Sequence, residues 1–473
     1  MPKLDDQRLF ALKPSLEDSR RSADGETQYL LVWGELPAWM LVDAELKALL
    51  DDFDGKRTVR DLLAEHARRW NKDRSKARRE ALPILKGLWQ QGILSSRARA
   101  PEPEPESIRI ANVTANLTNR CNLRCTFCYN TRRKNEELDI QQLMDGIEQS
   151  RSLLAEDASF IVLGGEPLLD LPRLLSAVER AETIFAPPTL LSTNGTLLSE
   201  HAVAQLVPRR LQVQVSLDSS HPDRHDAFRG HGVHAKAVAG VRRLTTAGIF
   251  TILSMVYTRD SVADMEGYLE LAQELGVDEA RFIPLRTIGK GLDCQALRPD
   301  QLLAFEHLLG ILKRRPELRR LLVRDYFSIL VTQLRFSSVR TNCGLGFKVV
   351  FIDADGSVYP CPNHVSPKYR AGTLRTESLA HIVTESPVFG AVRETHHVSR
   401  YRRCQSCPFR YWCAGDCRGE VLATYGDPLE PSPHCDQLIE IFRRVLWLLA
   451  TDQAPLGVRR VVADGTQTTE TFL

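Results

Sequence analysis

Long apolar runs, net charge and N-terminal cysteines are all scarce in this sequence. No stretch approaches the roughly 20 apolar residues of a membrane-spanning helix, and the N-terminus, MPKLDDQRLF, lacks the basic segment and apolar run of a secretory signal. We therefore expect a cytoplasmic protein without a membrane partner. The formal charge of +2 gives no global attraction to nucleic acid, so no nucleic-acid partner is expected.

The first 120 residues contain no cysteine, and all eleven cysteines of the chain follow them. The cytoplasm keeps thiols reduced, so structural disulfides are not expected and metal ligation is the leading explanation. A chain of 473 residues also exceeds what one hydrophobic core usually serves, which predicts several domains.

A stiff, charged spacer divides the chain, because residues 101–106 read PEPEPE. Before it, short β-type runs precede three helical patterns that begin near Asp43, Thr58 and Ser75, a winged-helix-like α+β order. The expected parts are a domain over 1–100, a linker over 101–107, a core over 108–337, a cysteine-rich region over 338–445 and a tail over 446–473.

The core region alternates strand and helix patterns. Helical stretches at 139–153, 171–183 and 233–247 separate short apolar runs, and 299–337 is mostly helical in pattern. The expected strands are VTANLT, FIVLGG, TLLSTNG, VQVSLD, TILSMVY and ARFIPL. This alternation predicts parallel strands joined by crossover helices in an open or closed α/β barrel, with its site at the carboxyl ends of the strands.

Three cysteines lie on one loop directly after the first of these strands, in TANLTNRCNLRCTFCYN. Cys121, Cys125 and Cys128 are enough to hold three irons of a cubane cluster while the fourth iron stays open to another ligand. A structural zinc site is the alternative, but it needs four ligands, and no fourth Cys or His is near in sequence.

The triad, the aromatic Phe127 and the motifs downstream resemble the radical S-adenosylmethionine superfamily over about residues 108–300. The resemblance implies a partial (β/α)6 barrel and a 4Fe-4S cluster that binds S-adenosylmethionine at its open iron. Cleavage of that cofactor would give a 5′-deoxyadenosyl radical, which abstracts hydrogen.

The resemblance also implies residues that contact S-adenosylmethionine. Gly165 and Glu166, in a GGEP motif, would hold the methionyl amino group, and Arg229 is the matching cation for the carboxylate. The full set of implied contacts is Phe127, Gly165, Glu166, Ser192, Asn194, Ser216 and Arg229.

Two polar residues beside Arg229 are candidate catalytic groups, namely His225 and Asp226 in HDAFRG. The alternative is that they only shape the loop. Leu285 and Arg286, near the last strand, are further candidates for the site.

Seven cysteines form a second group between residues 343 and 435. A zinc ribbon is the alternative reading, but the full register resembles the SPASM extension of radical enzymes that mature peptides and proteins. The resemblance implies two auxiliary 4Fe-4S clusters. Their ligands would be Cys343, Cys361 and Cys417 for the first, and Cys404, Cys407, Cys413 and Cys435 for the second.

The first auxiliary cluster would thus have only three cysteines. One of its irons would be open to substrate or bound by a non-cysteine group. Cys294, far upstream, is expected to be an ordinary buried thiol.

Residues 8–98 resemble the small PqqD-like domain that recognises precursor peptides in ribosomal peptide modification. Such domains add the leader segment as a strand at an exposed sheet edge. Five residues could line that edge or belong instead to the domain's own core, namely Tyr29, Leu31, Trp33, Trp39 and Leu41. A DNA-binding winged helix is the alternative for the whole domain.

Together these resemblances imply a radical maturase that modifies a core residue of a precursor peptide, by crosslink or thioether formation or by epimerisation. They also imply a low-potential electron donor of flavodoxin or ferredoxin type. One alternative is a formylglycine-forming enzyme of the sulfatase-maturating type, in which an aspartate typically follows the second cysteine of the C-terminal set; here Pro362 follows Cys361. The other is a non-catalytic iron-sulfur or DNA-binding regulator.

Overall fold

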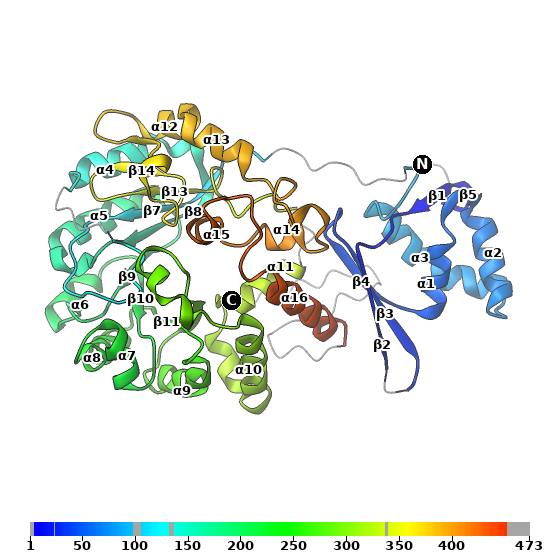
Figure 1. The fold of residues 1–473 in the computed structure, drawn as a ribbon, viewed down its shortest axis with the longest axis horizontal. Helices are drawn as coiled ribbons and strands as arrows, with labels where there is room; N and C mark the ends of the chain where they lie inside the picture. The colour runs from blue at the N-terminus through cyan, green and yellow to red at the C-terminus, as the bar shows by residue number, and fades with distance from the viewer. Residues whose placement is uncertain (1–3, 23, 98–105, 132–136, 336–338, 452–473) are drawn as a thin grey trace.

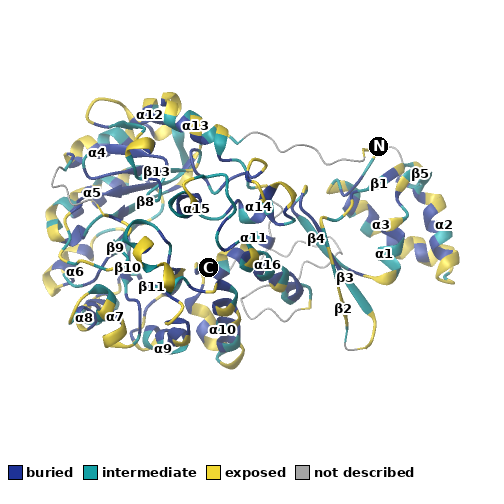
Figure 2. Cartoon of the chain, in the orientation of Figure 1, coloured by how far each residue is buried: buried dark blue, intermediate teal, exposed yellow. Residues whose placement is uncertain are grey.

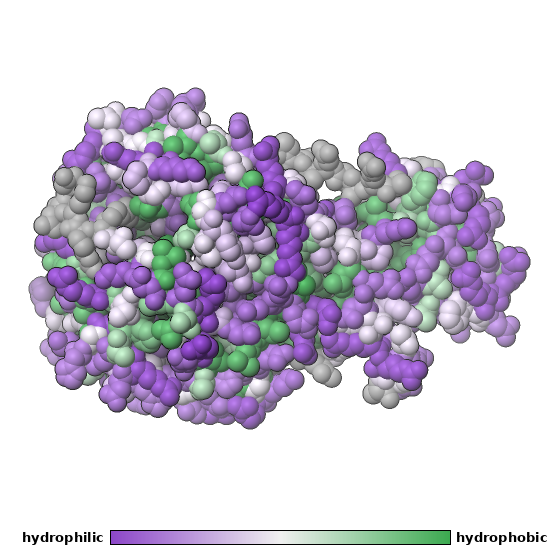
Figure 3. Space-filling model, in the orientation of Figure 1, coloured by the Kyte–Doolittle hydropathy of each residue, from purple (hydrophilic) through white to green (hydrophobic). Residues whose placement is uncertain are grey.

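The computed structural model of the chain describes residues 4–22, 24–97, 106–131, 137–335 and 339–451. A small N-terminal domain lies at one end of the molecule and a larger α/β body at the other (Figure 1). The predicted spacer, apart from Glu106, and the tail beyond residue 451 lie outside the described residues. Within the described ranges, no helix is both long and apolar enough to cross a bilayer, and the face in Figure 3 is mostly hydrophilic.

The N-terminal domain has two small antiparallel sheets and three helices. Its elements are β1 (Arg8–Ala11), β2 (Leu16–Arg21), β3 (Thr27–Trp33), β4 (Ala38–Asp43), α1 (Ala44–Asp51), β5 (Asp54–Thr58), α2 (Val59–Arg69), α3 (Arg74–Gln90) and β6 (Leu94–Ser95). The helices start where predicted because Asp43, Thr58 and Asp73 each cap a backbone N–H of the first turn. β2, β5 and β6 were not predicted.

The second half of β3, the central strand of the sheet β2-β3-β4, is buried on both faces, whereas β2 is largely exposed. Successive strand residues point to opposite sides, so Leu31 and Trp33 join the N-terminal core while Leu30 and Val32 join the core of the large body. The Trp33 indole N–H donates to the carbonyl of Leu12 at 2.7 Å. Of the two readings for these residues, the domain's own core holds for Leu31 and Trp33.

Six parallel strands form the centre of the large body, and they pair in chain order. They are β7 (Ile110–Asn116), β8 (Leu154–Leu163), β9 (Thr189–Thr193), β10 (Leu211–Ser216), β11 (Thr251–Tyr257) and β12 (Glu279–Pro284). All six predicted strands are confirmed. β11 is buried along nearly its whole length, which explains its unbroken apolar run, and Figure 2 shows that the sheet lies in the buried interior.

Helices cover the outer side of these strands (Figure 1). They are α4 (Ile140–Glu148), α5 (Leu171–Ile184), α6 (Glu200–Leu206), α7 (Pro222–Arg229), α8 (Val233–Thr246) and α9 (Met265–Glu274). The mostly helical segment predicted after the last strand is confirmed as α10 (Gln301–Arg314) and α11 (Tyr326–Arg335). Among the strands that the structure describes, β12 pairs with β11 alone, so the barrel is open.

The cysteine-rich region adds strands to the same sheet. β13 (Val349–Ile352) pairs parallel with β7, and β14 (Ser357–Tyr359) and β15 (Gly372–Thr373) follow in antiparallel order. Its helices are α12 (Leu379–Glu385), α13 (Pro387–Thr395), α14 (Arg410–Cys413), α15 (Arg418–Tyr425) and α16 (Cys435–Ala450). Val350 and Ile352 belong to the barrel core, so this region and the barrel share one hydrophobic interior.

Candidate active site

The cysteine loop that follows β7 is locked to the GGEP motif that follows β8. The backbone N–H of Gly165 donates to the carbonyl of Thr118, and that of Glu166 donates to the carbonyl of Arg120, both at 2.8 Å. A Cβ atom on residue 165 would lie 1.9 Å from the carbonyl oxygen of Arg120. Only glycine fits at this crossing, which explains the second glycine of the motif.

The three cysteines of this loop lie close enough to affect one another. Burial is the main reason that the pKa of Cys125 is raised; Arg229 opposes the rise, whereas Cys128 and Cys121 add to it. All three cysteines are partly exposed, and none is in a disulfide. The loop therefore presents three neighbouring sulfur donors on an accessible surface.

Glu166 is fully buried and connects two strand ends. Its carboxylate accepts from the Thr193 hydroxyl at 2.7 Å, from the Asn194 N–H at 2.8 Å and from the Leu168 N–H at 3.1 Å. Burial raises the pKa of this carboxyl. The side chain thus fixes the GGEP and STNG segments relative to each other. Thr193 is a site residue that sequence reasoning missed.

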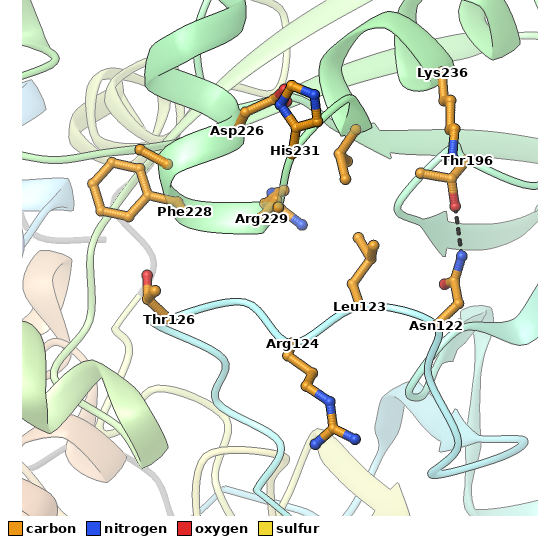
Figure 4. Close-up of a pocket in the computed structure, with 13 residues that line it drawn as sticks. Asn122, Leu123, Arg124, Thr126, Thr196, Asp226, Phe228, Arg229, His231 and Lys236 are labelled. Carbon is orange, nitrogen blue, oxygen red and sulfur yellow. Dashed lines mark hydrogen bonds between the residues drawn. The ribbon is translucent and has the colours of Figure 1, made fainter.

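Asn194 extends this connection to the cysteine loop. Its amide donates to the Asn122 side-chain oxygen at 2.9 Å, and the Asn122 amide donates to the Thr196 hydroxyl at 2.8 Å, the dashed line in Figure 4. Ser192 and Ser216, at the ends of β9 and β10, are half-buried. The loop, the GGEP motif and the third strand end form one hydrogen-bonded unit.

Arg229, near the end of α7, is a buried cation beside the cysteine loop. It donates to both carboxylate oxygens of Asp218, and its guanidinium lies 5.4 Å from the centre of the Phe127 ring. Burial alone would lower the pKa of Arg229, but Asp218, Cys125 and Cys128 hold it above its usual value. Asp218 follows β10, so Arg229 joins that strand end to the cysteine loop.

The two candidate catalytic residues both have structural partners. The Nδ1 atom of His225 accepts from the backbone N–H of Asp218 at 3.0 Å, and burial lowers the pKa of His225 to about 4. Asp226 accepts from the N–H groups of Gly232 at 2.5 Å and His234 at 2.9 Å. This geometry supports the alternative that His225 and Asp226 shape the loop between α7 and α8.

A cavity of about 500 Å³ opens between the cysteine loop and helices α7 and α8. In Figure 4, Leu123 and Thr126 point from the loop toward α7, and Arg124 points away. The cavity is lined by Asn122, Leu123, Arg124, Thr126, Thr196, Asp226, Ala227, Phe228, Arg229, Gly230, His231, Val233 and Lys236. Of the implied cofactor contacts, only Arg229 lines it; the other implied contacts lie elsewhere on the loop and at the strand ends.

The C-terminal cysteines fall into two sets. In the first, burial raises the pKa of Cys361, and Cys417 and Cys343 add to the rise. Asn363 lies between two of these sulfurs: its backbone N–H is 3.5 Å from Cys361 Sγ, and its side-chain amide is 3.4 Å from Cys417 Sγ. Cys417 and Cys343 thus lie near enough to Cys361 to affect its pKa.

The second set contains four cysteines. Burial raises the pKa of Cys404 to about 12, and Cys407 and Cys435 contribute. The pKa of Cys413 is raised by burial, by Asp416 and by the other three thiols. Cys404 and Cys413 thus each lie near enough to other members of this set for those thiols to raise their pKa values, and the division into two cluster sets stays a prediction.

No disulfide joins any of the eleven cysteines. Within the described part of the chain, no three Cys, His, Asp or Glu side chains converge where one metal ion could be held. Four thiolates on one zinc ion lie about 4 Å apart, whereas a cubane cluster places iron and sulfide between its ligands and spreads them further.

Cys294 is not a buried thiol, contrary to expectation. It is partly exposed in a 3-10 segment, Gly289–Leu297, and its sulfur lies 3.9 Å from the carbonyl of Thr126. This segment runs over the cysteine loop, and the Lys290 N–H donates to the Cys128 carbonyl at 3.0 Å. Cys294 thus lies at the surface next to the first cysteine set.

Arg286, after β12, binds the cysteine-rich region. Its guanidinium donates to Asp416 at 3.0 and 3.1 Å and to Glu420 at 2.7 Å. The neighbouring Leu285 is buried. Arg286 therefore has a carboxylate pair as its partner and connects the barrel to the chain around Cys417. The acidic residues in GDCRGE were a signal that the sequence reasoning did not use.

Asp353, directly after β13, makes a second connection of this kind. It accepts from the side-chain amides of Asn116 and Asn119, each at 3.1 Å. Asn116 ends β7 and Asn119 begins the cysteine loop. Asp353 was missed because its role depends on a pairing between segments more than 230 residues apart.

Comparisons with known proteins agree with this geometry. Residues 115–272 match the model of the radical SAM superfamily, and residues 343–408 match that of the iron-sulfur cluster-binding domain SPASM. The chain is 29% identical to mycofactocin maturase MftC of Mycobacterium ulcerans, over 69% of this chain and 87% of that protein. It is 28% identical to the PqqA peptide cyclase of Streptomyces rochei, over 69% of this chain and 89% of that protein.

The fold is similar to the crystal structure of Streptococcus suis SuiB bound to precursor peptide SuiA. The TM-score is 0.56 at 13% identity, and the match covers 90% of this chain and 99% of that chain. The unmatched tenth is smaller than the N-terminal domain, so the similarity extends into that domain. The chain is therefore a radical SAM enzyme that carries a C-terminal SPASM domain.

Proposed function

We propose that this protein is a peptide maturase that binds a ribosomally made precursor peptide and modifies one of its core residues by hydrogen abstraction. Ten of the cysteines form three sets, and the first set lies beside the GGEP motif and an open cavity. This arrangement carries the proposal. Three 4Fe-4S clusters would use all ten of these cysteines as ligands. Cys294 is the remaining cysteine.

The chemistry would depend on S-adenosylmethionine and the first cluster, which together supply a 5′-deoxyadenosyl radical when bound. Cys121, Cys125 and Cys128 would hold that cluster. The backbone at Gly165 would meet the methionyl amino group, and Arg229, already placed against Phe127, would meet the carboxylate. Glu166 would act by fixing these segments, because its oxygens are occupied by protein donors.

The peptide substrate is supported by the relatives, whose names describe a maturase and a peptide cyclase. SuiB, bound to a precursor peptide, shares the fold over a span that includes part of the N-terminal domain. We therefore assign leader recognition to the PqqD-like domain over residues 1–100. A low-potential flavodoxin or ferredoxin in the cytoplasm would reduce the clusters.

The leader would bind along the outer edge of β4. The second half of the central strand β3 is buried on both faces, and in the described residues β2 and β4 each pair with β3 alone, so their outer edges are the positions for an added strand. β2 reads LEDSRR, and such charges protect an edge from pairing. β4 reads AWMLVD and carries no charge before Asp43, which suits an added strand.

Leader binding is tested by photo-crosslinking. A leader peptide that carries a photoreactive residue at successive positions should label residues 38–43. Labelling of residues 16–21 instead would contradict the choice of edge. Labelling outside the N-terminal domain would contradict the assignment of leader recognition to that domain.

The comparisons favour neither alternative function. The regulator reading predicts no 5′-deoxyadenosine release, and the formylglycine reading predicts an aspartate where Pro362 stands.

The decisive experiment incubates the anaerobically reconstituted enzyme with reductant, S-adenosylmethionine and each short peptide encoded near its gene. Loss of two hydrogens outside the leader would indicate a crosslink, and unchanged mass with deuterium uptake would indicate epimerisation. Cys125→Ala is the control and should abolish both 5′-deoxyadenosine and product. If 5′-deoxyadenosine forms but no peptide changes, the peptide assignment fails.

A further inference from the structure

The first auxiliary set lacks a fourth cysteine, and the chain around it offers another donor. Cys343, Cys361 and Cys417 form this set, whereas the sulfur of Cys294 lies 3.9 Å from the carbonyl of Thr126 in the first cysteine loop. Four protein ligands would close a cubane cluster, and three would leave one iron for an outside group. The side chains next to these cysteines therefore decide whether the cluster is open.

His364 lies in the same turn as Cys361. Its backbone N–H donates to the Cys361 carbonyl at 3.0 Å. In such a turn, the first and fourth Cα atoms lie within about 7 Å of each other. The resulting C-x2-H spacing is short enough for both side chains to reach one metal centre.

The imidazole of His364 is buried and unpartnered. The residue is 2% exposed, and neither ring nitrogen has a hydrogen-bond partner. Buried polar groups in proteins are almost always paired, so two orphaned nitrogens on one ring indicate a missing partner. The ring packs at 5.1 Å against Tyr369, which belongs to the same hydrophobic cluster as Cys343 and Cys361.

The other polar side chains near this set are already engaged or are unsuitable. Asn363 presents N–H donors to two of the sulfurs. The Nδ1 atom of His396 lies 3.4 Å from the Tyr401 hydroxyl. Arg418 is a cation and cannot bind iron. His434 also has an unpartnered Nδ1, but its Nε2 faces Glu420, whereas both ring nitrogens of His364 lack a partner.

We propose that a ring nitrogen of His364 is the fourth ligand of the first auxiliary cluster. The inference rests on the proposed assignment of Cys343, Cys361 and Cys417 to that cluster. It deepens the proposed function, because a cluster with four protein ligands has no iron available to the peptide. This cluster would then accept or relay an electron and would not coordinate substrate.

The test uses full-length enzyme with Cys121, Cys125 and Cys128 replaced by alanine, reconstituted anaerobically without S-adenosylmethionine. Pulsed EPR of the reduced protein should show a directly coordinated nitrogen. That coupling should change when the protein contains 15N-labelled histidine, and it should disappear in His364→Gln. His396→Gln is the matched control, a buried neighbouring histidine, and should keep the coupling.

If His364→Gln does not assemble the first auxiliary cluster, His364→Cys provides a second test. It should bind as much iron as the parent, lose the nitrogen coupling and have a lower reduction potential, because a thiolate carries the charge that imidazole lacks. Absence of a histidine coupling in the parent, or its persistence in His364→Cys, overturns the inference. If Cys361→Ala loses no iron, the cluster assignment itself is wrong, which separates the two failures.

Discussion

Replacement of Arg286 by methionine should destabilise the junction between the barrel and the SPASM domain. The guanidinium makes three hydrogen bonds to two carboxylates whose side chains are 7% and 0% exposed, Asp416 and Glu420. Removing one partner of a buried ion pair costs about 3–5 kcal/mol. Thr287 and Ser432 still donate to these carboxylates, so we expect about 3 kcal/mol.

This loss should lower the apparent Tm of the cluster-loaded enzyme by about 3–5 °C, measured anaerobically by circular dichroism. The triple variant Arg286→Met/Asp416→Asn/Glu420→Gln removes the stranded charges and should regain at least half of the loss. Arg286→Lys keeps the positive charge, so its apparent Tm should fall less than that of Arg286→Met. An Arg286→Met protein that melts within about 2 °C of the parent, or a triple variant no better than the single one, would refute this account of the junction.

Three further outcomes are expected. Gly165→Ala places a methyl 1.9 Å from the Arg120 carbonyl and should lose the iron of one cluster, whereas Gly87→Ala, with open space around it, should keep all iron in a ferrozine assay. Asp353→Ala leaves two buried amides without their acceptor and should lower stability by about 1–3 kcal/mol, seen as a lower Tm. Burial lowers the pKa of His225 to about 4 in the folded protein, against an ordinary 6.5. The stability that His225 contributes is therefore fully present above pH 6.5 and is lost as the pH falls toward 4. His225→Asn, which keeps an acceptor for the Asp218 N–H, should therefore show a smaller drop in Tm than the parent on acidification; equal drops would contradict this.

The parts of the fold that the sequence could predict depend on local pattern. The strands of the barrel are short apolar runs, and the helix starts of the N-terminal domain carry their own caps in Asp43 and Thr58. The cysteine loop after β7 is likewise readable, because Cys121, Cys125 and Cys128 are closely spaced and directly follow the first strand. Proximity along the chain carries this information.

The parts that could not be predicted depend on contacts between distant segments. Glu166 looks like a cofactor contact in its motif, but its partners Thr193 and Asn194 follow the next strand. Arg286 has its carboxylates 130 and 134 residues away. The exposure of Cys294 depends on where the segment after β12 crosses the cysteine loop. No periodicity in one segment encodes such pairings.

The parallel pairing of β13 with β7 has a consequence for how this protein could be divided. The cysteine loop follows β7, and the SPASM domain supplies β13, the strand that pairs with the outer edge of β7. A chain cut before residue 338 would leave β7 as an unprotected apolar edge, open to pairing with other molecules. The radical SAM barrel and the SPASM domain are therefore not independently exchangeable. A chimera between relatives would have to take β7 and β13 from the same protein.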